Sequence, residues 1–192
     1  MNASGSAPDG SGRSWQTAFT SLHLALNAAE SDGCVVWVAK GTYRPETGEY
    51  GNATPSDPKA LSFIPGPNVA LYGGFAGTER HVSERNLSSN ESRLSGDIAD
   101  DDPPDSLFNN DTDNSYHVLV AEDSSERLDG FTITGGRASS ADDFNGYGGG
   151  ILNHASLFIK NCTFESNVAN KGGAIFNSAA RPKIESCLFT EN

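Results

Sequence analysis

Apolar and polar residues alternate along the C-terminal third of the chain. The alternation is clear around Cys162 and Phe164 and returns around Cys187 and Phe189. Neither stretch keeps helical spacing for two turns, and alternation of this kind is typical of a strand with one buried face. The pattern therefore predicts short strands joined by turns, most clearly across residues 128–192.

The same segment contains a sequence repeat of about 24 residues. Residues 148–153 (GGGILN) return as residues 172–177 (GGAIFN), a shift of 24, and residues 161–167 (NCTFESN) return as residues 186–192 (SCLFTEN), a shift of 25. A looser copy, residues 128–136, precedes the next by 31 positions because a polar insertion follows it. A fixed period of about 20 to 50 residues is typical of a solenoid.

One such unit cannot bury its own apolar face, so equivalent strands are expected to stack in parallel at about 4.8 Å per layer. A leucine-rich horseshoe would need a Leu-x-x-Leu-x-Leu pattern, and a propeller blade would need about 40 residues; the repeat offers neither. The sequence therefore predicts an all-β chain that folds as a right-handed parallel β-helix over residues 14–192.

Stacking would place equivalent side chains of neighbouring coils on top of one another. We expect an interior ladder of three pairs: Asn167 with Asn192, Cys162 with Cys187, and Phe164 with Phe189. Stacked asparagines satisfy each other's amides. The cysteines are expected to be free thiols that act as small hydrophobes, and a disulfide between coils is the alternative in an oxidising compartment.

A different pattern precedes the repeats. Ser14 is a favourable N-cap for a helix over residues 15–30, whose apolar stripe consists of Phe19, Leu22, Leu26 and Ala29. We expect a capping helix within residues 14–33 that covers the open backbone edge of the first coil. Residues 1–13 are predicted to be a flexible N-terminal segment.

Residues 94–115 are predicted to form a long acidic loop. Between Leu94 and Glu126 the chain has ten Asp and Glu residues and no Lys or Arg. Four of these carboxylates are weak candidates for Ca²⁺ binding: Asp97, Asp100, Asp101 and Asp102. Their spacing does not match the Asp-x-Asp-x-Asp-Gly loop of an EF-hand, so a solvated loop is the principal interpretation and structural Ca²⁺ is the alternative.

The charge balance limits the classes of partner. With 13 basic and 25 acidic residues the net charge is −12, which repels nucleic acid and anionic lipid surfaces. No apolar stretch approaches the roughly 18 residues of a membrane span, and residues 1–12 do not form a signal peptide. The sequence therefore predicts no nucleic-acid partner and no direct membrane insertion. No catalytic or cofactor-binding residue is predicted, because no nucleophile, phosphate-binding or zinc-protease motif occurs.

Several tetrapeptides resemble a family pattern. Residues 172–175 (GGAI), together with 164–167 (FESN) and 189–192 (FTEN), resemble the paired GGA[ILV] and FxxN repeats of polymorphic outer-membrane proteins and of autotransporter-passenger-like secreted bacterial surface proteins. Residues 36–43 and 71–79 are similar to the N-terminal part of large secreted bacterial β-helix proteins.

This resemblance implies a right-handed β-helix that is secreted or displayed at the cell surface or outer membrane in the full-length protein. It implies a structural or adhesion module that binds a surface protein or a glycan, without catalysis of its own. Because the same fold carries polysaccharide lyases and hydrolases, a carbohydrate-active enzyme with a groove along the stacked strands is the alternative. The chain is further expected to be a C-terminally truncated fragment whose uncapped last coil self-associates.

Overall fold

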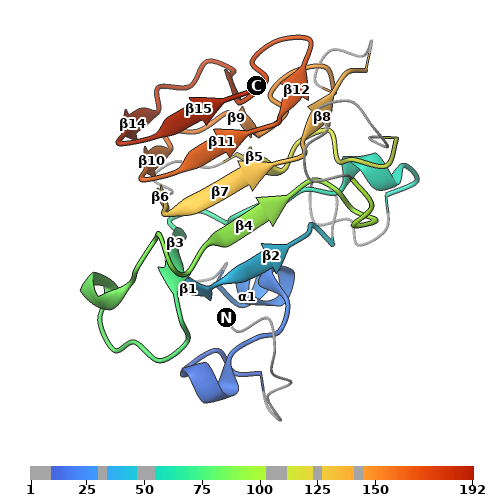
Figure 1. Ribbon diagram of the computed structural model, residues 1–192. Helices are drawn as coiled ribbons and strands as arrows, with labels where there is room; N and C mark the ends of the chain where they lie inside the picture. Colours follow the sequence, from blue (N-terminus) through green and yellow to red (C-terminus); the bar gives the residue numbers. More distant parts are fainter. Residues whose placement is uncertain (1–9, 30–33, 47–54, 103–111, 123–126, 141–144) are drawn as a thin grey trace.

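The computed structural model describes residues 10–29, 34–46, 55–102, 112–122, 127–140 and 145–192 (Figure 1). In these ranges the chain forms fifteen short strands, one α-helix and three single 3₁₀ turns. Every pair of neighbouring strands is parallel. The predicted all-β class with parallel strands is therefore confirmed.

The strands belong to four separate sheets, none of which closes on itself within the described residues. Sheet 1 contains, in spatial order, β1 (Val35–Ala39), β3 (Ala70–Phe75), β6 (Arg127–Asp129), β10 (Phe158–Lys160) and β14 (Lys183–Glu185). Sheet 2 contains β2 (Gly41–Tyr43), β4 (Ser92–Ser95), β7 (Phe131–Thr134), β11 (Thr163–Glu165) and β15 (Leu188–Thr190). Sheet 3 contains β5 (Leu119–Ala121), β9 (Ile151–Asn153) and β13 (Ile175–Asn177), and a fourth sheet pairs β8 (Arg137–Ala138) with β12 (Val168–Ala169).

The chain visits the sheets in the same order in each layer. Strands β6, β7 and β9 follow one another through sheets 1, 2 and 3, and β10, β11 and β13 do so in the next layer. In the first layer Phe63 takes the place of a sheet 3 strand through an isolated parallel bridge to Leu119. Neighbouring strands of one sheet are thus separated in sequence by strands of the other sheets, and parallel pairing requires a crossover connection of this kind.

The same tight turn returns between sheets 1 and 2 in successive layers. The residue that links the two strands has a φ of +84° at Gly130, +52° at Asn161 and +53° at Ser186. A second left-handed position follows the sheet 2 strands, at Gly135, Ser166 and Glu191. Residues such as Ser and Glu adopt this conformation at a steric cost, so the geometry of the layer, rather than local preference, sets the turn.

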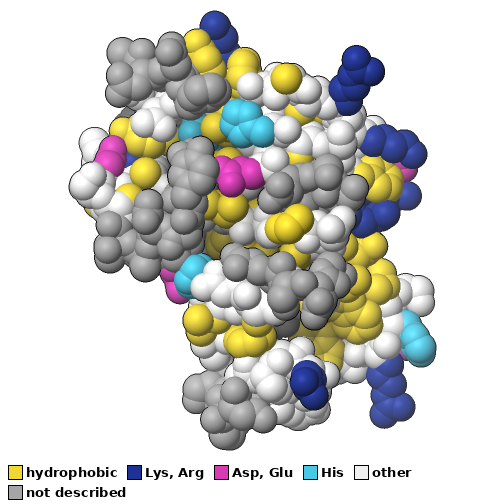
Figure 2. All heavy atoms as spheres, turned by 180° about the vertical axis from the view of Figure 1, so that it is seen from behind, with side chains coloured by type: hydrophobic (Ala, Val, Ile, Leu, Met, Phe, Trp, Pro, Cys, Tyr) yellow, Lys and Arg dark blue, Asp and Glu magenta, His cyan; other side chains and the backbone are white. Residues whose placement is uncertain are grey.

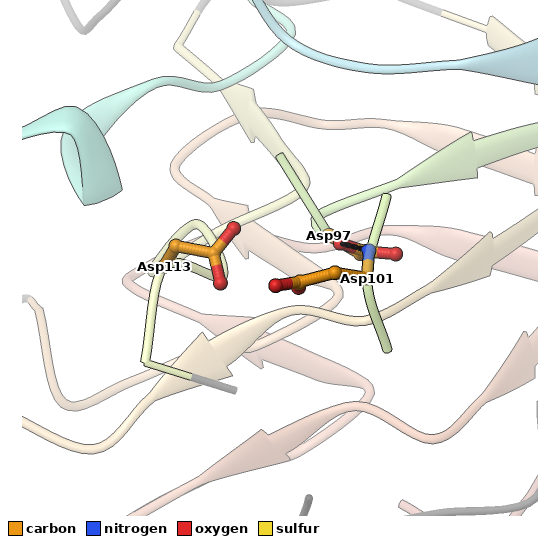
Figure 3. Close-up of side chains that lie close together, drawn as sticks. All are labelled: Asp97, Asp101 and Asp113. Atoms are coloured by element: carbon orange, nitrogen blue, oxygen red, sulfur yellow. Dashed lines mark hydrogen bonds between the residues drawn. The ribbon is translucent and has the colours of Figure 1, made fainter. Parts of the chain in front are cut away.

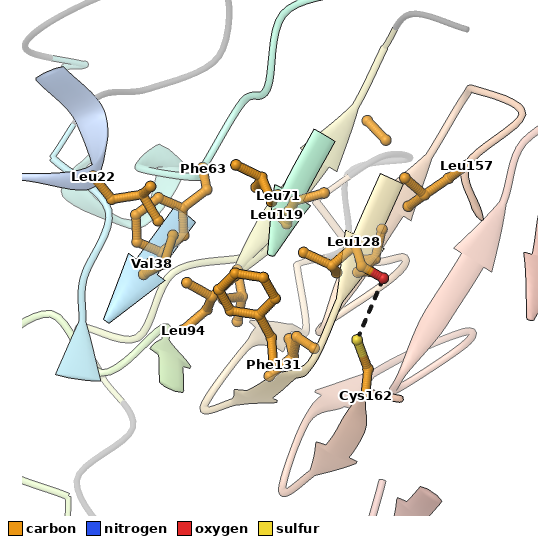
Figure 4. Packing of buried hydrophobic residues seen from close by; sticks show 14 of the residues in the cluster. Leu22, Val38, Phe63, Leu71, Leu94, Leu119, Leu128, Phe131, Leu157 and Cys162 are labelled. Carbon is orange, nitrogen blue, oxygen red and sulfur yellow. Dashed lines mark hydrogen bonds between the residues drawn. The ribbon is translucent and has the colours of Figure 1, made fainter. Parts of the chain in front are cut away.

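The interior is filled by rows of apolar side chains. In sheet 2 the in-register row of Leu94, Ile133 and Phe164 is fully buried. Figure 4 shows Leu94 together with further members of the same cluster, which extends from Leu22 in the helix to Cys162. Burying one side chain of this size contributes about 1.5–3 kcal/mol, so the stacked rows are the main source of stability.

The N-terminal helix is shorter than the sequence predicts. Ser14 caps only a single 3₁₀ turn, η1 (Trp15–Thr17), because Ser14 and Thr17 form a reciprocal capping box and the following Ala18 is extended. The α-helix, α1 (Leu22–Ala29), begins after this break. The prediction of one helix from residue 15 is therefore wrong. Of the predicted stripe, Leu22, Leu26 and Ala29 are buried in the core cluster together with Ala25, whereas Phe19 lies before α1 and is only partly buried against that cluster. Residues 1–9 and 30–33 of the predicted terminal segment and capping helix lie outside the described residues.

The outer face of sheet 1 carries cations against aromatic rings. The Arg127 guanidinium lies 5.5 Å from the ring centre of Tyr72 and 4.4 Å from that of Phe158, and the Lys183 ammonium lies 4.9 Å from Phe158. Figure 2 shows Lys and Arg side chains beside hydrophobic ones along the right margin of the molecule. Such contacts contribute about 0.5–1 kcal/mol each at exposed sites and link successive layers.

Candidate functional site

The acidic segment leaves the stack at the end of β4. Leu94 is fully buried in that strand, so the loop begins after Ser95 and not at residue 94 as the sequence predicts. The hydroxyl of Ser95 accepts a hydrogen bond from the backbone N–H of Asp97 at 3.3 Å, and Gly96 N–H donates to the Thr134 carbonyl at 2.9 Å. These bonds hold Asp97 just beyond the C-terminal end of β4, where only 8% of its surface is exposed.

Three carboxylates lie close together beyond the end of β4: Asp97, Asp101 and Asp113 (Figure 3). We call this group the acidic cluster. One oxygen atom from each lies within 4.8 Å of the others. The backbone N–H of Asp101 donates to Asp97 Oδ1 at 3.2 Å, and the N–H of Ala99 donates to Asp113 Oδ2 at 2.9 Å. The loop is therefore folded around its own carboxylates.

The structure places Asp100 outside the acidic cluster. Its carboxylate pairs with the Arg44 guanidinium and is largely exposed. Arg44 also donates through Nε to the Asp97 carbonyl at 2.7 Å, and Asp100 itself has a φ of +60°. Arg44 thus holds the loop from outside and draws one of the four sequence-predicted candidates away from the other carboxylates.

Asp102 lies beside the cluster without joining it. Asn114 donates through Nδ2 to Asp102 Oδ2 at 2.8 Å, and Asp102 Oδ1 is buried with no hydrogen-bond partner in the described part of the chain. Burial raises the pKa of Asp102 above its ordinary value, and the nearby charges of Asp97, Asp113 and Asp101 raise it further, against the lowering effect of Asn114. Several carboxylates therefore lie close enough together to disfavour a further negative charge on Asp102.

A hard divalent cation matches the chemistry of the acidic cluster. Ca²⁺ takes six to eight oxygen ligands at about 2.3–2.6 Å, and the three carboxylates supply only part of that set. Asp97 and Asp101 were expected from the sequence; Asp113 was not among the candidates, because it is separated from them by more than ten residues. Two further acids of the predicted loop, Asp105 and Asp111, lie outside the described residues.

The asparagines of the predicted interior ladder lie two residues beyond the ends of β11 and β15, and only the first of them is buried, because Asn192 in the last layer is exposed. Asn167 is fully buried, and its Nδ2 donates to Asn192 Oδ1 at 2.8 Å and to the Ile133 carbonyl at 2.9 Å. Asn192 repeats the second contact one layer further on, donating to the Phe164 carbonyl at 2.8 Å. The amides therefore satisfy backbone groups that the turns leave unpaired.

The aromatic and sulfur pairs lie in the same layers. The rings of Phe164 and Phe189 are stacked, with centroids 5.0 Å apart and planes at 6°. Cys162 and Cys187 are free thiols. Burial raises the pKa of Cys162 well above its usual range, whereas the hydrogen bond from the Cys162 thiol lowers the pKa of Cys187 to about 7. Cys187 is thus the more acidic of the two thiols.

Comparison with known proteins adds no relative: no family model, no curated protein and no solved structure matches the chain. Among the described residues no helix has the length and apolar character needed to cross a membrane.

Proposed function

We propose that the chain is a right-handed parallel β-helix and that it serves as a secreted or cell-surface structural and adhesion module, of the kind represented by polymorphic outer-membrane proteins. One observation carries the proposal: successive repeats pass through sheets 1, 2 and 3 in the same order, and equivalent residues pair in register. The row of Ile133, Phe164 and Phe189 is an example, at the spacing of the sequence repeat. Such stacking is the defining relation between coils of a solenoid.

The outer face of sheet 2 supports a structural and binding role. Arg93 pairs with Glu165 at 2.7 Å and with Glu91 at 3.0 Å, and the Thr132 hydroxyl donates to Glu91 at 2.8 Å. These contacts connect side chains of several layers across one polar surface. A surface whose side chains are held by one another offers a preorganised face to a partner.

Two measurements test the proposal together. The folded chain is immobilised on beads and incubated with a panel of soluble glycans and with a set of extracellular surface proteins. The heat-unfolded chain is the control. We expect the folded chain to retain at least one ligand and to release no reducing ends from pectin or alginate. Failure to retain any ligand would overturn the adhesion function, and release of oligosaccharide would support the carbohydrate-active enzyme instead.

A further inference from the structure

A cleft of about 780 Å³ lies at the N-terminal end of the stack. Residues 11–19, one side of α1, the beginning of β1 and the turn at residues 78–80 form its walls. Small-molecule sites typically occupy about 300–1,000 Å³. The cleft is therefore large enough for a ligand of one or two rings.

Two tryptophans form the apolar wall of the cleft. Trp37 is stacked on Phe75, with ring centroids 4.7 Å apart and planes at 9°. Trp15 packs 5.5 Å from Phe75 and 6.2 Å from Trp37, and its Nε1 donates to the Glu79 carbonyl at 2.9 Å. Because both rings are held by packing, the wall is preformed and costs little conformational entropy on binding.

Two arginines give the cleft a positive character. Arg13 and Arg80 both line it, both are exposed, and neither forms an ion pair with any described residue. The chain as a whole has a net charge of −12, so two guanidinium groups without ion pairs beside one cavity make this part of the surface unlike the rest. Guanidinium groups recognise carboxylates through paired, charge-assisted hydrogen bonds.

The acidic residue of the cleft does not cancel this charge by pairing with either arginine. The Glu79 carboxylate accepts backbone N–H bonds from Ala76 at 2.7 Å, Gly77 at 3.0 Å and Thr78 at 2.9 Å. Burial alone would raise the pKa of Glu79, but these N–H groups outweigh it and lower the pKa. Glu79 therefore shapes the turn, and both guanidinium groups remain available to a ligand.

We propose that the cleft binds an acidic sugar, a monosaccharide or disaccharide that carries a carboxylate. The sugar ring lies against the tryptophan wall, and its carboxylate is directed to Arg13 and Arg80. The hydroxyl and amide groups of Ser14, Gln16 and Thr78 also line the cleft and match the hydroxyls of a sugar. The inference rests on the proposed adhesion function, of which it names the ligand class.

Intrinsic fluorescence gives a direct test, because the only two tryptophans of the chain both line the cleft. Digalacturonate is titrated into the folded chain, with the uncharged disaccharide galactobiose as the matched probe. We expect saturable change of the emission with digalacturonate and about tenfold weaker binding of galactobiose. Arg13→Gln and Arg80→Gln should each weaken digalacturonate binding about tenfold, whereas Arg181→Gln, which removes an exposed arginine elsewhere, should leave it unchanged.

The outcomes separate this inference from the adhesion function. Equal binding of the charged and uncharged disaccharides, no binding of either, or equal behaviour of the Arg13, Arg80 and Arg181 variants would overturn the acidic-sugar site. If the chain then still retains another surface ligand on beads, the adhesion function stands without it. If the chain retains no ligand at all, both fail. The arginines are exposed, so the variants are expected to unfold at the temperature of the unaltered chain.

Discussion

Asn167 and Asn192, one repeat apart, are joined by a hydrogen bond of 2.8 Å between Nδ2 of the first and Oδ1 of the second. Asn167 also accepts the Gly136 N–H at 3.2 Å through its own Oδ1. Each asparagine donates to a carbonyl of the preceding layer, so the same side chain connects two layers at every recurrence. The pair is a polar ladder that runs from the buried Asn167 to Asn192, which is exposed at the end of the stack.

Replacing Asn167 by alanine should lower the free energy of unfolding by about 2–4 kcal/mol. The change leaves a buried carbonyl and a buried N–H without hydrogen-bond partners, and each such group costs about 1–3 kcal/mol. Asn192→Ala is the matched control and should cost about 1 kcal/mol or less, because Asn192 is exposed to water. Urea unfolding of both variants measures the difference, and an equal or larger loss for Asn192→Ala would contradict the ladder's role.

The buried His117 should make the fold less stable as the pH falls. Its Nδ1 donates to the Gly148 carbonyl at 3.1 Å, and burial lowers its pKa to about 4 from an ordinary 6.5. The stabilising contribution of the neutral ring is complete above pH 6.5 and is lost as the pH falls from 6.5 towards 4, a change of about 3 kcal/mol.

Urea unfolding at several pH values between 7 and 4 checks this expectation. His117→Asn should remove most of the pH dependence in that window, since an amide can donate to Gly148 but does not titrate. His23→Asn, which removes a histidine from the α1 surface, serves as the control and should leave the slope unchanged. The same slope in all three proteins would show that other groups cause it.

The acidic cluster should bind Ca²⁺ weakly. With a dissociation constant of about 1 mM, 10 mM Ca²⁺ would add about 1.4 kcal/mol, which raises the melting temperature of a domain of this size by about 3–6 °C. Asp113→Asn should abolish the rise, and Asp100→Asn should retain it, because Asp100 pairs with Arg44 outside the cluster. Calorimetry with and without Ca²⁺ provides the measurement. An unchanged melting temperature at 10 mM Ca²⁺ would contradict the prediction and favour the interpretation of a solvated loop.

The open edge of sheets 1 and 2 should make the 192-residue chain self-associate. Strands β14 and β15 lie at this edge, and three apolar side chains there are exposed to 41%, 59% and 46%: Ile184, Leu188 and Phe189. Unpaired strand edges with exposed apolar residues recruit other chains. Light scattering should show a mass that rises with concentration, and Leu188→Lys should reduce it. Leu24→Lys, half exposed on α1, is the control; a monomer at all concentrations would contradict the prediction.

Much of the strand arrangement follows from the sequence because the repeat is periodic. The shift of 25 residues that relates Cys162 to Cys187 also predicts the observed pairing of Phe164 with Phe189. Binary patterning and period together decide which residues face inward, since every second side chain of a strand shares one face. Neither the pattern nor the period predicts where the helix begins, because the Ser14–Thr17 capping box fits a single turn as well as a helix.

The parallel pairing of strands across residues 128–192, including Phe164 with Phe189, follows from the sequence, because it depends on a period within one stretch of chain. Which distant residues meet depends on the tertiary structure. In the folded chain Asp113 lies close to Asp97 and Asp101, and Asp100 pairs with Arg44 instead. Trp15 packs beside Trp37. The spacing of these residues in the sequence predicts none of these contacts. The physical reason is that such contacts depend on how loops and the N-terminal segment pack on the finished stack, and local propensities do not specify that packing.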